Sequence, residues 1–228
     1  MTVIPATSFC LNGKNSKTNK VRKSMIKEIL TKEILTKELA KELMEIKGEA
    51  RGVVFKTDAD SILKQKGREG LRRVEKRLKE VDYPIEYGKI KEMDFYPIGL
   101  RAVSLLAIKE VFNFSKEDIK KIGTEAPKIS FIIKLFTQYF FSLNQLAQKA
   151  ADIWQRHYTI GQLSAKVNEK EGYAILEVHD LVIHPVFCSY LEGYFLTILR
   201  MLVKKTVISE ESKCTFKGDE YHEFLLKW

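Results

Sequence analysis

The sequence predicts an α+β protein, with a helical N-terminal half followed by a β-β-α-β-β antiparallel sheet packed on the helices. Apolar residues follow helical periodicity through most of the chain up to about Tyr158. From Leu163 onward they alternate with polar residues, as in a strand with one buried face. An apolar segment that begins at Pro185 and is long enough for a helix separates two such alternating regions.

The composition is that of a folded globular protein. Of 228 residues 45% are hydrophobic, and 39 Lys and Arg against 30 Asp and Glu give a net charge of +9. This excludes a disordered chain, and no stretch approaches the roughly 18 uncharged apolar residues of a membrane span. The basic excess is spread among glutamates and accompanies no nucleic-acid-binding motif, so we expect no nucleic acid partner.

The cysteine content predicts a reducing compartment. Cys10, Cys188 and Cys214 are too few, and odd in number, for a disulfide framework. The charges near the N-terminus follow its mildly apolar start, whereas a secretory signal has the opposite order. We therefore expect a cytoplasmic protein.

The N-terminal region is predicted to lie outside the main domain. Residues 1–19 are polar and aperiodic, which predicts a disordered tail. Residues 20–48 contain a repeated Lys-Glu-Ile-Leu-Thr and predict a helical arm. A five-residue step winds the apolar stripe around the helix, so we expect no single buried face, contact at one end only, and self-association as a homodimer.

A single α+β domain is predicted over residues 50–228. After the apolar run at 51–55, helices are expected at about 58–66, 68–81, 98–113, 115–122 and 128–157. Ser115 and Asp118 are spaced like a capping box at the start of one of them. A hairpin is expected at 163–167 and 174–178, then a helix from Pro185 to about Val203, and a second hairpin at 206–216 and 221–228.

The register of the last hairpin follows from its apolar pattern. A two-residue turn of Gly218 and Asp219 would place Cys214 opposite Glu223, whereas a loop of residues 218–220 places it opposite Phe224. We favour the longer loop because it puts the apolar residues of both strands on one face, towards the helices. That face would carry Cys214, Phe216, His222, Phe224, Leu226 and Trp228.

The C-terminal motif resembles that of 4-vinyl-reductase domains. It reads Glu-x-x-Cys214-x-x-x-Gly-x-x-x-His222-x-Phe224-x-x-x-Trp228, preceded by Cys188-x-x-x-x-Gly193. The chain also resembles a related bacterial family that begins with a strand like residues 51–55 and has a Trp-x-x-x-Tyr-x-x-Gly segment, here starting at Trp154. The resemblance covers about residues 50–228. It implies a fold shared with H-NOX domains and TRAPP vesicle-tethering subunits, with a ligand pocket between helices and sheet.

Aromatic residues are the candidates for lining that pocket, because ligand pockets are mostly apolar. Simple core packing would give the same periodicity and stays the alternative. The candidates are a stripe on the predicted helix 128–157, together with three residues elsewhere: Phe131, Phe136, Tyr139, Phe140 and Phe141, then Trp154, Phe216 and Phe224.

Thiol and imidazole side chains suggest a metal site. Cys188, Cys214 and His222, joined by His184, have the ligand types of zinc, although their spacing is not that of a known zinc ribbon or finger. The alternative is a buried cysteine beside a hydrogen-bonded histidine. The 4-vinyl-reductase domains usually have a second cysteine where this chain has His222, which weakens the metal hypothesis.

Haem is not expected as a cofactor. The Tyr-x-Ser-x-Arg motif with which H-NOX relatives bind it does not occur here, and His157 is the one plausible axial ligand. No phosphate-binding loop or catalytic triad signature is present either, so an enzyme is not favoured.

The favoured function is a non-enzymatic small-molecule-binding or sensory module in bacterial signalling. It would bind a hydrophobic small molecule and act on a protein partner. One alternative is a scaffold or assembly protein without a ligand. The other is an enzyme acting on a tetrapyrrole-like substrate.

Overall fold

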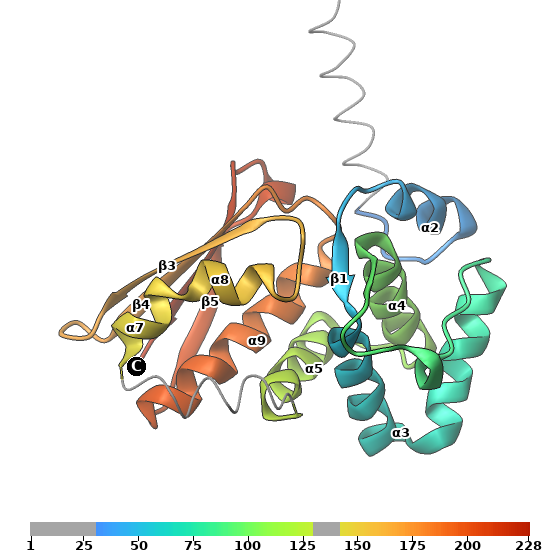
Figure 1. The fold of residues 1–228 in the computed structure, drawn as a ribbon, viewed down its shortest axis with the longest axis horizontal. Coiled ribbons are helices and arrows are strands. Elements are labelled where there is room, and N and C mark those ends of the chain that lie inside the picture. The colour runs from blue at the N-terminus through green and yellow to red at the C-terminus, as the bar shows by residue number, and fades with distance from the viewer. Residues whose placement is uncertain (1–30, 130–141) are drawn as a thin grey trace, which may run out of the picture.

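The computed structural model describes residues 31–129 and 142–228, and it confirms the predicted α+β class. A sheet with α7 and α8 forms one half of the molecule, α2 to α4 form the other, and α5 and α9 lie between them (Figure 1). The first half of the chain contains α2 (Lys37–Met44), β1 (Glu49–Arg51), α3 (Gly52–Glu80), β2 (Phe95–Pro97), α4 (Ile98–Val111) and α5 (Lys116–Ile129). The second contains α7 (Leu143–Gln148), α8 (Ala150–Gln155), β3 (Gln162–Asn168), β4 (Tyr173–His179), α9 (Val186–Val203), β5 (Ile208–Lys213) and β6 (His222–Lys227).

The main sheet is four-stranded and antiparallel, in the order β3-β4-β6-β5. The first hairpin and the helix that begins after Pro185 form as predicted. A second, two-stranded sheet of β1 and β2 was not predicted, because three-residue strands carry no usable alternation. Helices α7 and α8 pack on β3, whereas α9 packs on β5 and β6.

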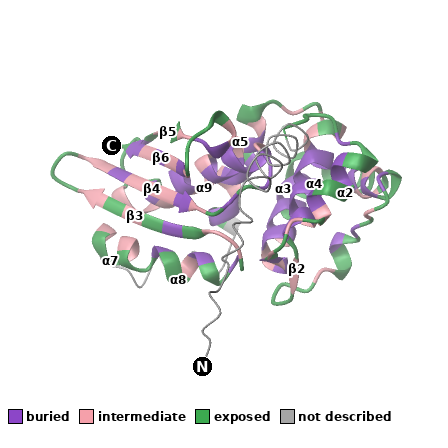
Figure 2. Ribbon diagram, turned by 90° about the horizontal axis from the view of Figure 1, so that it is seen from above, coloured by how far each residue is buried: buried purple, intermediate pink, exposed green. Residues whose placement is uncertain are grey.

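Helices α5 and α9 approach each other closely. A side chain at Gly123 would collide with the carbonyl oxygen of Tyr190, and one at Gly193 with that of Lys120. Glycine is therefore required at both positions of this crossing. The buried residues in Figure 2 run along α9 and along the inner sides of α3 and α4, so the core extends through both halves.

A buried ion pair joins α3 to α4 inside this core. Asp58 and Arg101 are both fully buried, and Arg101 Nη2 donates to Asp58 Oδ1 over 3.0 Å. The guanidinium also lies 4.7 Å from the ring centroid of Tyr190 on α9. This pair was not predicted from the sequence, because the pairing of two charged residues on different helices depends on how the helices pack.

The predicted N-terminal arm differs from the structure where it is described. Residues 31–36 are not helical, and α2 begins only at Lys37, where the Thr36 hydroxyl accepts from the Leu39 amide over 3.1 Å. Leu39 and Leu43 are buried against α4, so this helix does have one buried face. The five-residue step plays no part in α2, because both copies of Lys-Glu-Ile-Leu-Thr, at 27–31 and 32–36, come before Lys37 in the sequence. The division into tail, arm and domain stays a prediction.

The family resemblance implied a strand at residues 51–55. This was wrong beyond Arg51, because the following residues are helical. β1 ends at Arg51, and α3 starts at Gly52, where a side chain would collide with the Lys91 carbonyl oxygen. The two predicted helices at 58–66 and 68–81 are parts of α3, which breaks its helical geometry at Gly67, with φ of 67°. Glycine tolerates that backbone angle at no steric cost.

The continuous helix predicted for 128–157 was also wrong. Ser142 is extended and its hydroxyl accepts from the Gln145 amide over 3.2 Å, so a new helix, α7, begins there. A further break at Lys149 separates α7 from α8. Five of the candidate pocket residues lie outside the described residues: Phe131, Phe136, Tyr139, Phe140 and Phe141. The expected helix at 98–113 and the capping pair of Ser115 and Asp118 are confirmed.

The last hairpin has the predicted inward face but not the predicted register. Glu211, not Cys214, lies opposite Phe224, and a bulge lies between Glu211 and Lys213. The reason is a 3-10 turn at Thr215–Lys217, which lengthens the connection beyond three residues. His222, Phe224, Leu226 and Cys214 are buried nevertheless.

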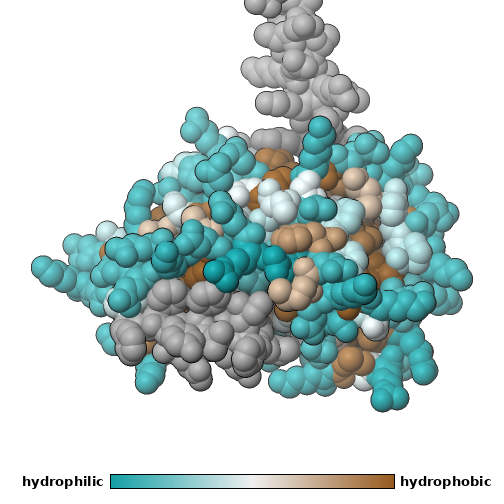
Figure 3. Space-filling view, in the orientation of Figure 1, coloured by the Kyte–Doolittle hydropathy of each residue, from teal (hydrophilic) through white to brown (hydrophobic). Residues whose placement is uncertain are grey.

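Helix α9 alone, among the described residues, is long and apolar enough to cross a membrane. It behaves as a core helix, because its buried side chains face α5 and the sheet. The face of the molecule drawn in Figure 3 is mostly hydrophilic, with apolar residues showing between charged ones.

Candidate ligand cavity and thiol–imidazole cluster

An apolar cavity of about 110 Å³ lies among α5, α7, α8, α9, β3, β4 and the start of α3. We call it the apolar cavity. Its walls are formed by aliphatic and aromatic side chains on all of these elements, among them Leu146, Ala150, Ala165, Leu176, Leu191 and Phe195. Pockets of this composition bury apolar molecules against their walls, and a few polar side chains fix the orientation of the ligand. The described polar groups are Thr57, His157, Tyr158, Tyr190 and Tyr194.

His157 is a neutral, buried imidazole at the edge of this cavity. It is 7% exposed, and burial lowers its pKa below the ordinary value. Its Nδ1 lies 3.0 Å from the Ile153 carbonyl oxygen, so with the proton assigned to Nδ1 that nitrogen donates and Nε2 keeps a lone pair. This is the second-sphere arrangement that orients metal-binding histidines.

Three described residues were predicted to contact a ligand, and they lie in different places. Trp154 lines the cavity, and its indole donates to the Ile160 carbonyl oxygen over 2.9 Å. Phe224 lies in the core behind the cavity, with its ring centroid 5.3 Å from that of Phe195. Phe216 lies beside His222, with the ring centroids 5.9 Å apart. That these residues contact a ligand stays a prediction.

Sequence reasoning missed the cavity walls formed by α9 and by the first hairpin. Tyr190 and Tyr194 are on α9, and Ala165 and Ala174 face inward from β3 and β4. A signal was present in the alternating strand pattern, where two inward positions carry alanine instead of a larger residue. Small inward residues leave space, but only the packed structure shows that the space is not filled by a neighbour.

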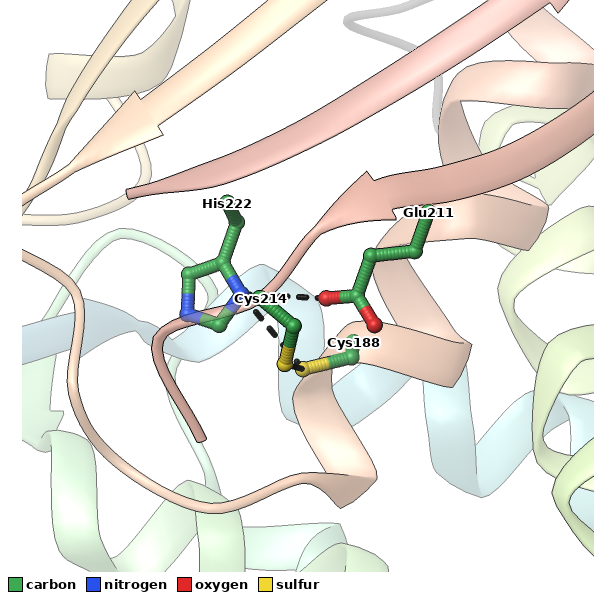
Figure 4. Close-up of side chains that lie close together, drawn as sticks. All are labelled: Cys188, Glu211, Cys214 and His222. Atoms are coloured by element: carbon green, nitrogen blue, oxygen red, sulfur yellow. Dashed lines mark hydrogen bonds and ion pairs between the residues drawn. The ribbon is translucent and has the colours of Figure 1, made fainter. Parts of the chain in front are cut away.

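The second feature is a cluster of four polar side chains from distant parts of the chain (Figure 4). We call it the thiol–imidazole cluster; it consists of Cys188, Glu211, Cys214 and His222. The two Sγ atoms are 3.9 Å apart, and His222 Nδ1 lies 3.7 Å from Cys188 Sγ and 3.0 Å from Glu211 Oε1. Both cysteines and the histidine are buried.

Hydrogen bonds within the cluster shift the pKa values of both cysteines and of His222. The hydrogen bond with Cys188 lowers the pKa of Cys214 to about 3, and the same bond raises that of Cys188 because its thiol is the donor. Burial opposes charge on His222, but its hydrogen bonds with Cys214 and Glu211 raise its pKa to about 9.

The structure brings together three of the four predicted metal ligands and replaces the fourth. His184 is not in the cluster, because its Nε2 bonds the Lys32 carbonyl oxygen at 3.0 Å and its Nδ1 accepts from the Val186 amide at 3.0 Å. Glu211 takes its place. The signal for Glu211 was its position three residues before Cys214, but a lone glutamate in an alternating strand is normally a solvent-facing residue.

Comparison with solved structures identifies the fold. An H-NOX protein from S. oneidensis in the Fe(II)NO ligation state has a TM-score of 0.61 and 11% identity, over 78% of this chain and 98% of that one. An oxygen-binding H-NOX domain related to soluble guanylate cyclases gives 0.55 and 15%, over 78% and 94%. A third, solved to probe haem distortion in the H-NOX family, gives 0.56 and 14%, over 78% and 94%. No protein-family model matches the sequence, and no curated protein matches it significantly.

The expectation that haem is not a cofactor was wrong in its premise. The chain shares its fold with H-NOX domains solved in an Fe(II)NO state, as an oxygen complex and to probe haem distortion. The absence of one sequence motif therefore does not exclude haem. The residues present fit haem in donor chemistry, since His157 offers a neutral nitrogen at an apolar cavity. At about 110 Å³ the cavity would have to widen to hold a porphyrin.

Proposed function

We propose that the chain is a ligand-binding sensor module whose ligand occupies the apolar cavity. The observation that carries the proposal is the cavity itself, which is lined by side chains of seven elements, α3, α5, α7, α8, α9, β3 and β4. A ligand there contacts α9, which also packs on α5 and on the far strands of the sheet. Binding therefore has a physical route to the rest of the molecule, through a helix that cannot shift without moving its neighbours.

Two ligand classes follow from the cavity walls. A small apolar molecule would fill the existing space and use the Tyr158 or His157 side chain for orientation. Haem is the second class, and the hydrogen bond between His157 Nδ1 and Ile153 favours it, because that bond leaves Nε2 free to hold iron. Haem would supply an iron able to take a gaseous ligand. His157 would orient it, and the apolar walls would exclude water.

The finer parts of this proposal rest on sequence. The likeness to 4-vinyl-reductase domains, the place in bacterial signalling and the protein partner are supported by the resemblance of the C-terminal motif, and the homodimer by the apolar repeat in residues 20–48. Light scattering at micromolar concentration tests the homodimer directly. A ligand-free scaffold and an enzyme acting on a tetrapyrrole-like substrate are the competing functions.

The test uses two probes on the full chain: haem, and N-phenyl-1-naphthylamine as an uncharged apolar fluorophore. Saturable binding of either, at a ratio near one per chain, supports the proposal. The Ala165→Leu substitution should weaken binding of both probes, because the new side chain enters the cavity. The Ser164→Ala substitution, on the exposed side of the same strand, is the matched control.

The two ligand classes separate at His157. The His157→Ala substitution should abolish the haem absorption spectrum of a histidine-ligated iron, and added imidazole should restore it. The same substitution should weaken fluorophore binding far less than haem binding, because the fluorophore would be held mainly by the apolar walls. If neither probe binds saturably to the wild-type chain, the ligand-binding proposal is wrong and the scaffold is favoured.

A further inference from the structure

The thiol–imidazole cluster joins three separate parts of the fold at one point. Cys188 is in the first turn of α9, Glu211 is on β5, Cys214 follows β5, and His222 begins β6. Figure 4 shows the four side chains directed towards one another from these elements. We propose that the cluster is a zinc site that fastens the N-terminus of α9 to the β5–β6 hairpin. It is separate from the apolar cavity, because none of its four residues lines that cavity.

The spacing of the ligand atoms matches a zinc tetrahedron. Zinc–sulfur bonds of about 2.3 Å and zinc–nitrogen bonds of about 2.0 Å, at tetrahedral angles, put two sulfurs about 3.8 Å apart and a sulfur and a nitrogen about 3.5 Å apart. The observed separations are 3.9 Å for the two sulfurs and 3.7 Å for Cys188 Sγ and His222 Nδ1. All four ligand atoms lie within 4.8 Å of one another.

Of these three separations between ligand atoms, the one between Glu211 and His222 differs from the tetrahedral value and shows what would move. The Glu211 carboxylate lies 3.0 Å from His222 Nδ1, as a hydrogen bond, whereas two ligands of one zinc would be about 3.4 Å apart. A shift of a few tenths of an ångström in the carboxylate is enough. Glu211 is only partly buried and its other oxygen lies 4.0 Å from Lys217 Nζ, so the side chain has room to adjust.

Zinc binding would displace the proton that His222 Nδ1 shares with Glu211, and the surroundings then hold the ring in the tautomer that binds metal. Its Nε2 lies 2.9 Å from the Leu181 carbonyl oxygen and 2.9 Å from Thr215 Oγ1. A proton on Nε2 donated to that carbonyl leaves the lone pair on Nδ1, the nitrogen that faces the two sulfurs. A backbone carbonyl behind a histidine ligand is the usual second-sphere partner in zinc sites.

Cys214 is also held in place by a hydrogen-bonded turn. Its carbonyl oxygen accepts from the amides of Lys217 and Asp219 over 2.9 and 3.2 Å, and its own amide donates to Asp219 Oδ2 over 2.7 Å. These bonds fix the sulfur at the start of the turn before any metal arrives. A preformed thiolate position of this kind lowers the entropy cost of binding.

The ligand set selects zinc and a structural role. Two thiolates, one imidazole and one carboxylate are all accepted by zinc, and four protein ligands close its tetrahedron and leave no position for substrate. Iron–sulfur clusters normally need four cysteines, so they do not fit. Plain core packing does not account for Glu211, since a carboxylate directed at two sulfurs and an imidazole gains nothing from apolar contact.

The test measures metal on the full chain, purified under reducing conditions and then desalted. We expect close to one zinc per chain after incubation with Zn²⁺. Replacing zinc with Co²⁺ should give visible d–d bands of tetrahedral cobalt together with a near-ultraviolet thiolate-to-cobalt band. The Cys214→Ser and His222→Gln substitutions should each reduce zinc affinity at least 100-fold, and Glu211→Gln at least 10-fold.

The control is His179→Gln on the neighbouring strand, whose imidazole is stacked on Tyr221 and is not in the cluster. It should retain full zinc binding. The proposal is overturned if the wild-type chain holds no stoichiometric zinc, if its cobalt spectrum lacks the thiolate band, or if His179→Gln loses zinc as His222→Gln does. Since the cobalt spectrum is taken on the wild-type chain, misfolding of a variant leaves the result decisive. Failure of haem or fluorophore binding would not affect it, because the cavity uses other residues.

Discussion

The apolar cavity and the thiol–imidazole cluster are both built on α9, yet they are opposite kinds of site. The cavity is formed by side chains that are individually unremarkable, such as Ala165 and Leu176, and its property is unfilled space. The cluster is formed by four reactive side chains, and its property is short distances between them. A cavity can therefore be altered by adding one methyl group, whereas a cluster is altered only by removing a ligand. The predictions below test whether α9 makes these two regions one cooperative unit.

The largest effect is expected at Phe224, a core residue that connects the two regions. Phe224 is fully buried, follows His222 by two positions on β6, and packs against Phe195, which lines the cavity. Phe224→Ala should lower the free energy of unfolding by about 3–5 kcal/mol, as buried Phe truncations do. Urea denaturation measures it. Leu225→Ala, on the other face of the strand, is the control and should cost less than about half as much. Equal losses would mean that β6 does not bury the face assigned to it.

Zinc should produce the next largest effect, and only through the cluster. At free zinc 100 to 1,000 times its dissociation constant, the free energy of unfolding should rise by about 3–4 kcal/mol. Thermal or urea denaturation in zinc buffers, with and without a chelator, measures the change. The Cys214→Ser variant should show no such increase. An increase that persists in this variant would place the metal elsewhere on the chain.

A pH effect of similar size is expected at His184, which is outside both regions. Burial lowers its pKa to about 4, against about 6.5 for an exposed histidine. The folded state therefore prefers the neutral ring, so this stabilisation is complete above about pH 6.5 and is lost as the pH falls towards 4. The loss is on the order of 3 kcal/mol.

Urea denaturation across this range measures the loss. The His184→Gln variant can keep a donor for the Lys32 carbonyl but does not titrate, so its stability should fall less steeply with acid. If both proteins lose stability in parallel, acid acts through other groups and His184 is not the cause.

The smallest stability effect is expected from filling the cavity. Ala165→Leu should change the free energy of unfolding by less than about 1.5 kcal/mol, because the new side chain enters existing space. Its effect on fluorophore affinity should be at least tenfold, with zinc affinity unchanged. Fluorescence titration and metal analysis on the same preparation measure both. A parallel loss of zinc binding would show that α9 transmits the change from one region to the other.

Local sequence pattern was sufficient to predict the order of the strands and of the helix between them from Leu163 onward. Alternation from Leu163 onward and the apolar helix after Pro185 predicted the order of β3, β4, α9, β5 and β6, because each strand buries one face against a single layer. The same pattern predicted the inward face of β6. It did not predict the register, because the 3-10 turn at Thr215–Lys217 is fixed by hydrogen bonds to the Cys214 carbonyl and not by hydrophobicity.

Helix boundaries before the main sheet were less predictable, and each error has a local cause. Thr36 and Ser142 begin helices within segments that look continuously helical, because a hydroxyl that caps a backbone amide competes with helix propagation. At Gly52 the start of α3 is set by the close approach of the Lys91 carbonyl, which is distant in sequence. None of these contacts changes the apolar periodicity on which the predictions relied.

The sequence by itself determined the α+β class, the inward face of the last strand and three of the four cluster residues, since side-chain type and period are local properties. Only the tertiary structure decided that Glu211 completes the cluster, that His184 does not, and that an unfilled space remains beside α9. Distances between residues separated by more than 20 positions, and the volume left between packed helices, depend on how whole elements meet. That information is distributed over the entire core, and no single segment of the chain contains it.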